Sequence, residues 1–270
     1  MFRLTREVRF AINAVPDGQL AHRPSNSYGG FPSLTGLGHY LTLQVTLAGD
    51  LDPDSQYLRN IKEIDQAVRE RAVPRVEAMV RAAAREGTRL TGPDLLLTLF
   101  DLLRGAWPGA TLHALRLSLS PFLTYSVLAT EHPMVRLSQK FEFSATHRLH
   151  NPALSEAANR ETFGKCNNPH GHGHNYEVQV TLAGKPAESG VLVDVPKFER
   201  VVQETVIDRL DHKNLNVEVP EFRDAKLIPS VENIAMTIYR MLKPKLGASD
   251  ARLASVTVWE TPKTWCEYSE

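Results

Sequence analysis

The chain has 270 residues, 42% of them hydrophobic, and its 31 lysine and arginine residues balance 31 aspartate and glutamate residues. This neutral balance does not favour a nucleic acid or an anionic membrane surface as a partner. No apolar run reaches the roughly eighteen residues that cross a bilayer, and the N-terminal residues lack the apolar core of a secretion signal. Two cysteines, Cys166 and Cys266, form no disulfide framework. We therefore expect a soluble, cytoplasmic protein of one or two domains.

The sequence of the first half predicts the order strand, strand, helix, helix, strand, strand. Alternating apolar residues predict strands over Val8–Ile12 and Leu41–Leu47. Apolar residues at helical spacing predict helices over Tyr57–Val73 and Pro93–Leu103. Alternation returns over Leu112–Leu119, where we expect a strand that closes this half.

The second half repeats this order. Segment Gly36–Gly49 aligns without gaps on segment Gly171–Gly184, an offset of 135 residues. Around the second segment, the same patterns predict strands over Phe141–Ala145, Glu177–Leu182 and Leu253–Trp259, and helices over about Pro196–Leu210 and Ser230–Leu242.

Two copies of one unit follow from this repeat. We predict an α+β fold in which each half has an antiparallel four-stranded sheet with two helices on one face. Pro133 interrupts regular structure at Glu131–Pro133, so we place the domains at residues 1–132 and 133–270.

The densest chemical signal is a run of histidines before the second strand of the second half. His172 and His174 are two residues apart, so in an extended chain their side chains point to the same face and can reach one metal ion. A zinc site needs at least three such donors. His147, at the end of the neighbouring predicted strand, is a candidate for the third, and His150 and His170 compete with it. Imidazole also suits copper, nickel or iron.

Cys166 lies six residues before His172, beside Lys165 and two asparagines. Cationic, polar surroundings and a nearby metal lower the pKa of a thiol and produce a thiolate that acts as a base or nucleophile. The alternative is that Cys166 is a fourth metal ligand, which would close the site.

Two further polar positions are candidates for proton transfer or ligand binding. Asp211 and His212 follow a predicted helix, and a carboxylate beside an imidazole can orient it for proton transfer, although a solvated turn is the alternative. Glu260 stands at the end of a predicted strand, where a carboxylate can accept paired N–H groups from a ligand or simply be an exposed charge.

From about residue 138 to the end, the chain resembles the 6-pyruvoyltetrahydropterin synthase family. Five motifs carry the resemblance, in the family's order: Ser144–Leu149, Phe163–Tyr176, Leu210–Leu215, Val231–Asn233 and Trp259–Thr261. The resemblance implies the tunnelling fold, in which the sheets of several subunits or domains assemble into a barrel and active sites form at interfaces. It therefore implies a homo-oligomer.

The resemblance also assigns roles to residues of this chain. It implies zinc as the cofactor, with His147, His172 and His174 as ligands, and it favours His147 over His150 and His170. It implies catalysis by Cys166, Asp211 and His212, and substrate binding by Glu260, Glu232 and Ser230. His170 and Val231 depart from residues that are frequent in relatives, so loop contacts differ there.

The activity implied by the resemblance is a lyase reaction on 7,8-dihydroneopterin triphosphate. The zinc ion would bind side-chain hydroxyls, Cys166 would remove a proton, and Asp211 with His212 would move another. Triphosphate would leave and 6-pyruvoyltetrahydropterin would form with no redox cofactor.

The first half lacks most of these groups. Ala14 and Leu37 stand at the places of His147 and His172, and only His39 matches a ligand, His174. Phe31 and Pro32 lie near the place of Cys166, and Leu119 takes that of Glu260. One imidazole does not hold a catalytic metal. We expect a degenerate, structural copy; the alternative is that it binds a different ligand.

Two other functions compete with the first. One is the synthesis of 6-carboxytetrahydropterin from the same substrate, with release of acetaldehyde, in a pathway to queuosine. Relatives of that kind usually space the cysteine and the histidine pair more closely than Cys166 and His172. The other is a zinc- and pterin-binding protein without turnover, against which Cys166, Asp211, His212 and Glu260 argue.

Overall fold

The computed structural model describes residues 1–13, 37–246 and 251–270. It divides into two compact units: Met1–Leu137 with Gly184–Leu192, and Ser138–Ala183 with Val193–Glu270. The expectations about Ala14, Phe31, Pro32 and Gly36 lie outside the described residues. In the part of the chain that is described, no helix has both the length and the apolar character to cross a membrane.

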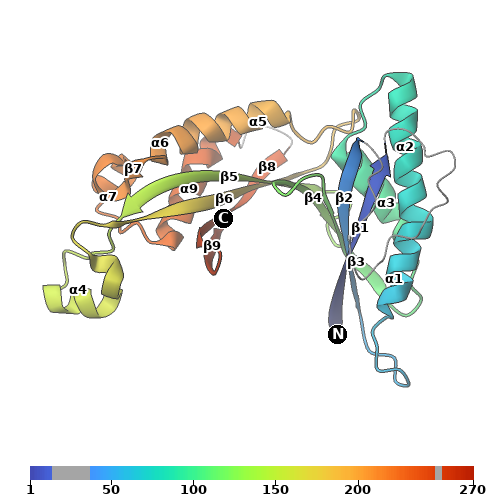
Figure 1. Cartoon of the computed structure of the whole chain (residues 1–270), viewed down its shortest axis with the longest axis horizontal. Coiled ribbons are helices and arrows are strands. Elements are labelled where there is room, and N and C mark those ends of the chain that lie inside the picture. Colours follow the sequence, from blue (N-terminus) through green and yellow to red (C-terminus); the bar gives the residue numbers. More distant parts are fainter. Residues whose placement is uncertain (14–36, 247–250) are drawn as a thin grey trace. The chain divides into compact units, whose positions relative to one another are not determined.

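The first unit is an antiparallel sheet in the order β1-β2-β3-β4 with helices on one face (Figure 1). Its elements are β1 (Phe2–Asn13), β2 (Gly38–Gly49), α1 (Ile61–Ala67), α2 (Val73–Glu86), α3 (Gly92–Leu103), β3 (Thr111–Ser118) and β4 (Leu123–Leu128). Alternate strand residues such as Val8 and Leu43 are buried and face one another across the β1–β2 ladder. These residues and the apolar stripe of α3 form its core.

The first helical region is longer than predicted. It begins after Asn60, whose side chain caps the backbone N–H of Lys62, and it continues beyond Val73 to Glu86. A π-helical turn over Val68–Ala72 joins α1 to α2 immediately before Pro74. This turn changes the backbone hydrogen bonding, so the helix accommodates a proline that would otherwise break it.

The loop Gly184–Leu192 belongs to this first unit although it follows a strand of the second. The hydroxyl oxygen of Thr91, at the start of α3, lies 2.8 Å from the carbonyl oxygen of Gly190 and 2.8 Å from Asp94 Oδ2, and these two acceptors share its single hydrogen. Gly190 has a φ of +73° and lies directly against the Asp94 carboxylate. Only glycine combines that conformation with so close an approach.

The second unit has a sheet in the order β5-β6-β8-β9, with α5 and α9 on one face (Figure 1). The strands are β5 (Val135–His147), β6 (His172–Gly184), β7 (Lys213–Asn214), β8 (Ala251–Thr261) and β9 (Thr264–Tyr268). The helices are α4 (Glu156–Phe163), α5 (Val195–Val202), α6 (Asp208–Leu210), α7 (Leu215–Glu218), α8 (Pro220–Arg223) and α9 (Val231–Leu246). A π-helical turn over Gln203–Ile207 connects α5 and α6, so the predicted helix to Leu210 forms.

The predicted α+β class is confirmed, with differences in detail. The two-residue strand β7 pairs with β5 in parallel and adds to the expected four strands. Helix α4, capped by Ser155, was not predicted because its eight residues show no apolar stripe. Strands β1 and β9 lie at sheet edges, so the sheet of a single chain is not closed into a barrel in the described residues.

Candidate functional site

Three histidines meet where β5 ends and β6 begins. His147 is the last residue of β5, and His172 and His174 alternate with Gly173 at the start of β6. Because neighbouring side chains of a strand alternate between faces, His172 and His174 share the face that carries the buried Tyr176. The metal-ligating atoms of the three histidines all lie within 4.8 Å of one another. We call these three residues the histidine cluster.

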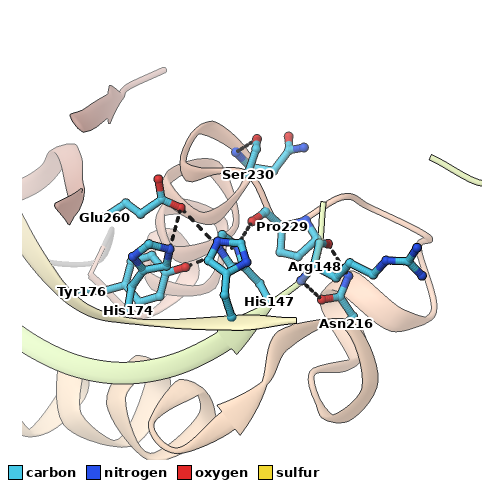
Figure 2. A network of polar contacts seen from close by, with 10 residues as sticks. His147, Arg148, His174, Tyr176, Asn216, Pro229, Ser230 and Glu260 are labelled. Carbon is cyan, nitrogen blue, oxygen red and sulfur yellow. Dashed lines mark hydrogen bonds and ion pairs between the residues drawn. The ribbon is translucent and has the colours of Figure 1, made fainter. Parts of the chain in front are cut away.

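His147 is held rigidly at the base of the cluster. Its side chain is fully buried, and its Nδ1 lies 2.7 Å from the carbonyl oxygen of Pro229 (Figure 2). That carbonyl accepts a hydrogen bond from Nδ1, which leaves the lone pair of Nε2 free to bind a cation. This Nε2 lies 3.1 Å from Nε2 of His172. The contact with Pro229 therefore sets both the orientation and the tautomer of His147.

The cluster contains buried ring nitrogens that lack a hydrogen-bond partner in the described residues. Within the described residues, Nδ1 of His172 and Nε2 of His174 are buried without a hydrogen-bond partner. Buried polar atoms are nearly always paired, so two orphaned nitrogens in one cluster need an explanation. Three imidazole nitrogens at this spacing match the donor set of a zinc site. The residues present therefore fit the metal that the sequence predicted.

The cluster favours neutral imidazole. Burial is the main cause that lowers the pKa of His147 below 6.5, and the neighbouring His172 and His174 lower it further. Burial also lowers the pKa of His174, and the charge of His172 acts in the same direction, against a raising effect from Glu260. Only a neutral imidazole binds a metal, so this environment prepares the ligands.

Glu260 lies beside the cluster, as Figure 2 shows. Its Oε1 is 3.3 Å from Nε2 of His147 and 3.6 Å from Nε2 of His174. A register shift between Trp259 and Thr261 in the β8–β9 ladder adjoins this position. The carboxylate therefore faces the histidines and is not merely an exposed charge at a strand end.

Cys166 is on a 3-10 turn, Gly164–Asn167, and is partly exposed. Its backbone carbonyl accepts a 2.9 Å hydrogen bond from the N–H of Leu149, two residues beyond His147. The pKa of Tyr176 is raised by three causes. Burial is the largest, followed by the charge of Glu260 and then by the charge of Cys166. Among the described residues, Cys166 is not in the set of ligand atoms that includes the histidine cluster, so the geometry does not favour a fourth ligand.

Asp211 and His212 form a hydrogen-bonded pair directly after α6. Oδ2 of Asp211 lies 2.7 Å from Nδ1 of His212, and Oδ1 accepts a 2.8 Å hydrogen bond from the N–H of Ser144. The bond from Ser144 is the main cause that lowers the pKa of Asp211, and the bond with His212 adds to it. The side chain of His212 is 82% exposed, and its φ is +56°.

His212 borders a pocket of about 480 Å³ whose lining also includes Ser144, Thr146, His174, Asn175 and Glu218. Ser144 alternates with Ala145 along β5, and its hydroxyl bonds to the side chain of Asn175 on β6. Ser144 and Asn175 therefore point to the sheet face opposite to that of His147 and His174. Among the described residues, the metal-ligating set consists of the three histidines and includes neither Asp211 nor His212, although His212 and His174 line the same pocket.

Ser230 and Glu232 lie at the start of α9. Ser230 follows Pro229, and its hydroxyl accepts a 3.4 Å hydrogen bond from the N–H of Asn233, as a helix cap does. Ser230 therefore neighbours the residue that orients His147 (Figure 2). Glu232 is exposed in the first turn of the helix. Burial is the main cause that raises the pKa of Cys266, and the charge of Glu232 is the second.

Sequence reasoning missed Tyr176 and Pro229 as parts of the site. Tyr176 continues the alternation of His172 and His174, which was a usable signal, and its hydroxyl lies 3.3 Å from Nδ1 of His147. Pro229 acts through a backbone carbonyl, 82 residues away in sequence. A backbone acceptor leaves no trace in residue type, so no sequence signal identified it.

The described residues of the first half show no comparable site. In its described residues, no group of three or more metal-ligating side chains occurs. Leu37 is 92% exposed, and His39 lies on β2 opposite Ile12. Leu119 lies in the turn between β3 and β4, where its N–H donates to the carbonyl of Leu123.

Comparison with known proteins identifies the family. A family model described as 6-pyruvoyl tetrahydropterin synthase matches residues 136–270, which is half of the chain. The chain belongs to the 6-pyruvoyl tetrahydropterin synthase family. The match spans the histidine cluster, Cys166, the Asp211–His212 pair and Glu260, and the resemblance predicted from the sequence is confirmed.

Relatives agree with this assignment. The chain is 39% identical over 140 residues to a 6-pyruvoyl tetrahydrobiopterin synthase of Drosophila melanogaster, covering 52% of this chain and 82% of that protein. It is 41% identical over 128 residues to the human protein of that name, covering 47% and 85%. The structure of a Caenorhabditis elegans 6-pyruvoyl tetrahydropterin synthase is 39% identical, with coverage of 51% and 96% and a TM-score of 0.48.

Proposed function

We propose that residues 133–270 form a catalytic domain that converts 7,8-dihydroneopterin triphosphate to 6-pyruvoyltetrahydropterin and eliminates triphosphate. Family membership supports the substrate class, since relatives with about 40% identity are named for this synthesis. The observation that carries the proposal is the histidine cluster with Glu260 3.3 Å from His147, because three imidazoles and a carboxylate then lie together.

Each residue has a proposed role. Glu260 accepts N–H groups of the pterin ring, and Ser230 and Glu232 add contacts from the start of α9. The Cys166 thiolate removes a proton from the substrate side chain, and His212, oriented by Asp211, moves a second proton. His147, His172 and His174 would hold the zinc ion, which supplies stabilisation of negative charge on the substrate oxygens.

The same geometry favours an assembly of several chains. Within one chain, His212 borders a pocket with Ser144 and Asn175, whose side chains point to the sheet face opposite to that of the histidine side chains, although His174 also lines this pocket. Supply of the two groups by different copies would bring them to one site. We propose a homo-oligomer in which another copy supplies Asp211 and His212 to the histidine cluster, with sheets assembled around a barrel.

We further propose that residues 1–132 are a degenerate copy with a structural role. Its sheet and helices supply strands and interface to the assembly. The described residues of this half contain no cluster of three or more metal-ligating side chains, which supports a role other than catalysis.

The test is to incubate zinc-loaded full-length protein with 7,8-dihydroneopterin triphosphate and to identify the pterin product by mass spectrometry. The proposal predicts 6-pyruvoyltetrahydropterin with release of triphosphate. Production of 6-carboxytetrahydropterin and acetaldehyde would assign the chain to the competing synthesis. Pterin binding without triphosphate release would show a binding protein.

A further inference from the structure

The turn that carries Cys166 is fastened to the end of β5 by a polar clamp. We define this clamp by the side chains of Arg148, Asn167 and Asn216. None of the three is a candidate ligand or proton carrier in the proposed reaction. All three are buried or half-buried, and each bonds to the backbone of a neighbouring segment.

Asn167 makes the central contacts of the clamp and is only 4% exposed. Its side-chain nitrogen donates a 2.7 Å hydrogen bond to the carbonyl of Leu149 and lies 3.1 Å from Nδ1 of His150. Its backbone carbonyl accepts a 3.0 Å bond from Nε of Arg148. With the bond from the N–H of Leu149 to the carbonyl of Cys166, these contacts join the turn to the residues that directly follow His147.

Asn216, on α7, secures Arg148 from the other side (Figure 2). Its side-chain oxygen accepts a 2.7 Å bond from the N–H of Arg148, and its side-chain nitrogen donates a 2.9 Å bond to the carbonyl of Arg148. Both backbone groups of Arg148 are thus held by one amide. Because Arg148 directly follows His147, the clamp connects the Cys166 turn to the histidine cluster through a single residue.

The backbone on both sides of the turn depends on glycine. Gly164 has a φ of +52° and Gly171 a φ of +74°, conformations that favour glycine. A Cβ at Gly171 would lie 3.0 Å from the carbonyl oxygen of His147, so this end of the segment already touches the strand. Between the two glycines, the contacts of Asn167 determine where Cys166 lies.

We infer that Asn167, supported by Arg148 and Asn216, is a positioning residue that fixes the Cys166 thiol relative to the histidine cluster. The inference rests on the proposed role of Cys166 as a base. A displacement of about 1 Å costs a reaction on the order of 100-fold in rate, so a buried amide that fixes the turn would control turnover without touching the substrate.

The test is Asn167→Asp in a Cys266→Ser background, which leaves Cys166 as the single thiol. The substitution preserves shape but replaces the N–H donor to Leu149 with an oxygen that repels its carbonyl. We expect kcat to fall by about 10- to 100-fold with KM changed less than about threefold. The pH dependence of the rate at which iodoacetamide alkylates Cys166 should also differ between the variant and the parent. Zinc content should remain that of the parent.

Asn168→Asp is the matched control. Asn168 is the adjacent residue, is exposed, and its side-chain oxygen accepts a 3.1 Å bond from the N–H of His170, which aspartate preserves. This variant should keep the kcat and the alkylation profile of the parent. If Asn167 has a purely structural role, the Asn167→Asp variant will have a lower melting temperature but the same kcat per folded molecule as the parent.

The inference is wrong if folded, zinc-loaded Asn167→Asp has the kcat and alkylation profile of the parent. If that variant does not fold, Arg148→Lys decides, because it keeps the charge but loses the Nε donor to Asn167; an unchanged kcat and alkylation profile would then overturn the inference. If the parent itself shows no turnover, the proposed function fails, and the alkylation profiles still test the positioning of Cys166.

Discussion

Nε2 of His147 and Nε2 of His172 lie 3.1 Å apart, although 25 residues separate them in sequence. The Nδ1–H group of His147 donates to the carbonyl of Pro229. Nε2 of His147 therefore carries the lone pair, which points toward His172. Two imidazole nitrogens in this arrangement share either a proton or a cation. With His174 alongside and Nδ1 of His172 unpaired within the described residues, we interpret the arrangement as a metal site.

The first prediction concerns metal retention. His172→Ala removes one of three donors and should weaken zinc binding by more than about 100-fold. Zinc content after dialysis, measured by mass spectrometry of the metal, checks this. His170→Ala is the matched control, since His170 is an exposed histidine two residues away. Its substitution should leave the zinc content unchanged. Equal loss of zinc from both variants would contradict the assignment of ligands.

The second prediction concerns the stability of the metal-free protein between about pH 5.5 and about pH 7.5. The pKa values of His147 and His174 lie below 6.5 in the folded chain, so the unfolded chain binds more protons in this range. The free energy of unfolding should therefore rise as the pH rises toward 6.5 and fall as the pH drops below it. The lowered pKa of Asp211 acts separately, below 3.8.

Urea unfolding at about pH 5.5 and at about pH 7.5 measures this difference in the free energy of unfolding. His174→Gln removes one titrating group and should make the difference between the two free energies smaller. His113→Gln, on β3 of the other unit, is the control and should leave the difference as it is. If His174→Gln leaves the difference unchanged, burial of neutral histidine in the cluster is not its source.

The third prediction concerns complementation between chains. Cys166→Ala and His212→Ala should each lower turnover by about 100- to 10,000-fold, the usual contribution of an acid or base. Because sites form between copies in the proposed assembly, co-expression of the variants should create sites that take Cys166 from one chain and His212 from another. Random mixing would restore roughly a quarter of the sites.

Activity of the co-purified mixture, compared with the two variants mixed after separate purification, measures the complementation. A chain that carries both substitutions is the control, because it cannot restore activity with either single variant. If the co-expressed mixture is no more active than its parts, each site takes Cys166 and His212 from the same chain.

The fourth prediction concerns Gly190 in the first unit. A methyl group there would overlap the Asp94 carboxylate, which is held by the hydroxyl of Thr91. Gly87→Ala is a matched control, because Gly87 also has a positive φ, +65°, but a Cβ there has nothing within 4 Å. We expect Gly190→Ala to lower the free energy of unfolding by about 1–3 kcal/mol more than the control does. Equal losses in urea unfolding would show that the contact with Asp94 is unimportant.

Much of the fold was predictable because its strands and helices carry clear apolar periods. The burial of Val8, Phe10 and Ile12 on β1 reproduces the alternation of the sequence. The helix that continues to Glu86 was not predicted, since Pro74 normally ends a helix and a π-helical turn has no simple sequence signal.

The candidate site was predictable to the extent that its side chains stand in motifs. His172 and His174 follow from strand alternation, whereas residue patterns alone left His147, His150 and His170 as alternatives for the third donor. The structure favours His147 among these three, because the carbonyl of Pro229 bonds to its ring. The position of Asp211 and His212 beside β5 depends on the pairing of β7 with β5, and a strand of two residues leaves no recognisable pattern in the sequence.

The most direct measurement of the central claim is a time course of triphosphate and pterin product from 7,8-dihydroneopterin triphosphate, with the zinc-loaded full chain and with its Cys166→Ala variant. The account predicts equimolar triphosphate and 6-pyruvoyltetrahydropterin from the parent, and a rate lower by about 100-fold or more from the variant at the same zinc content. Absence of triphosphate release by the parent, or equal rates from the two proteins, would contradict it.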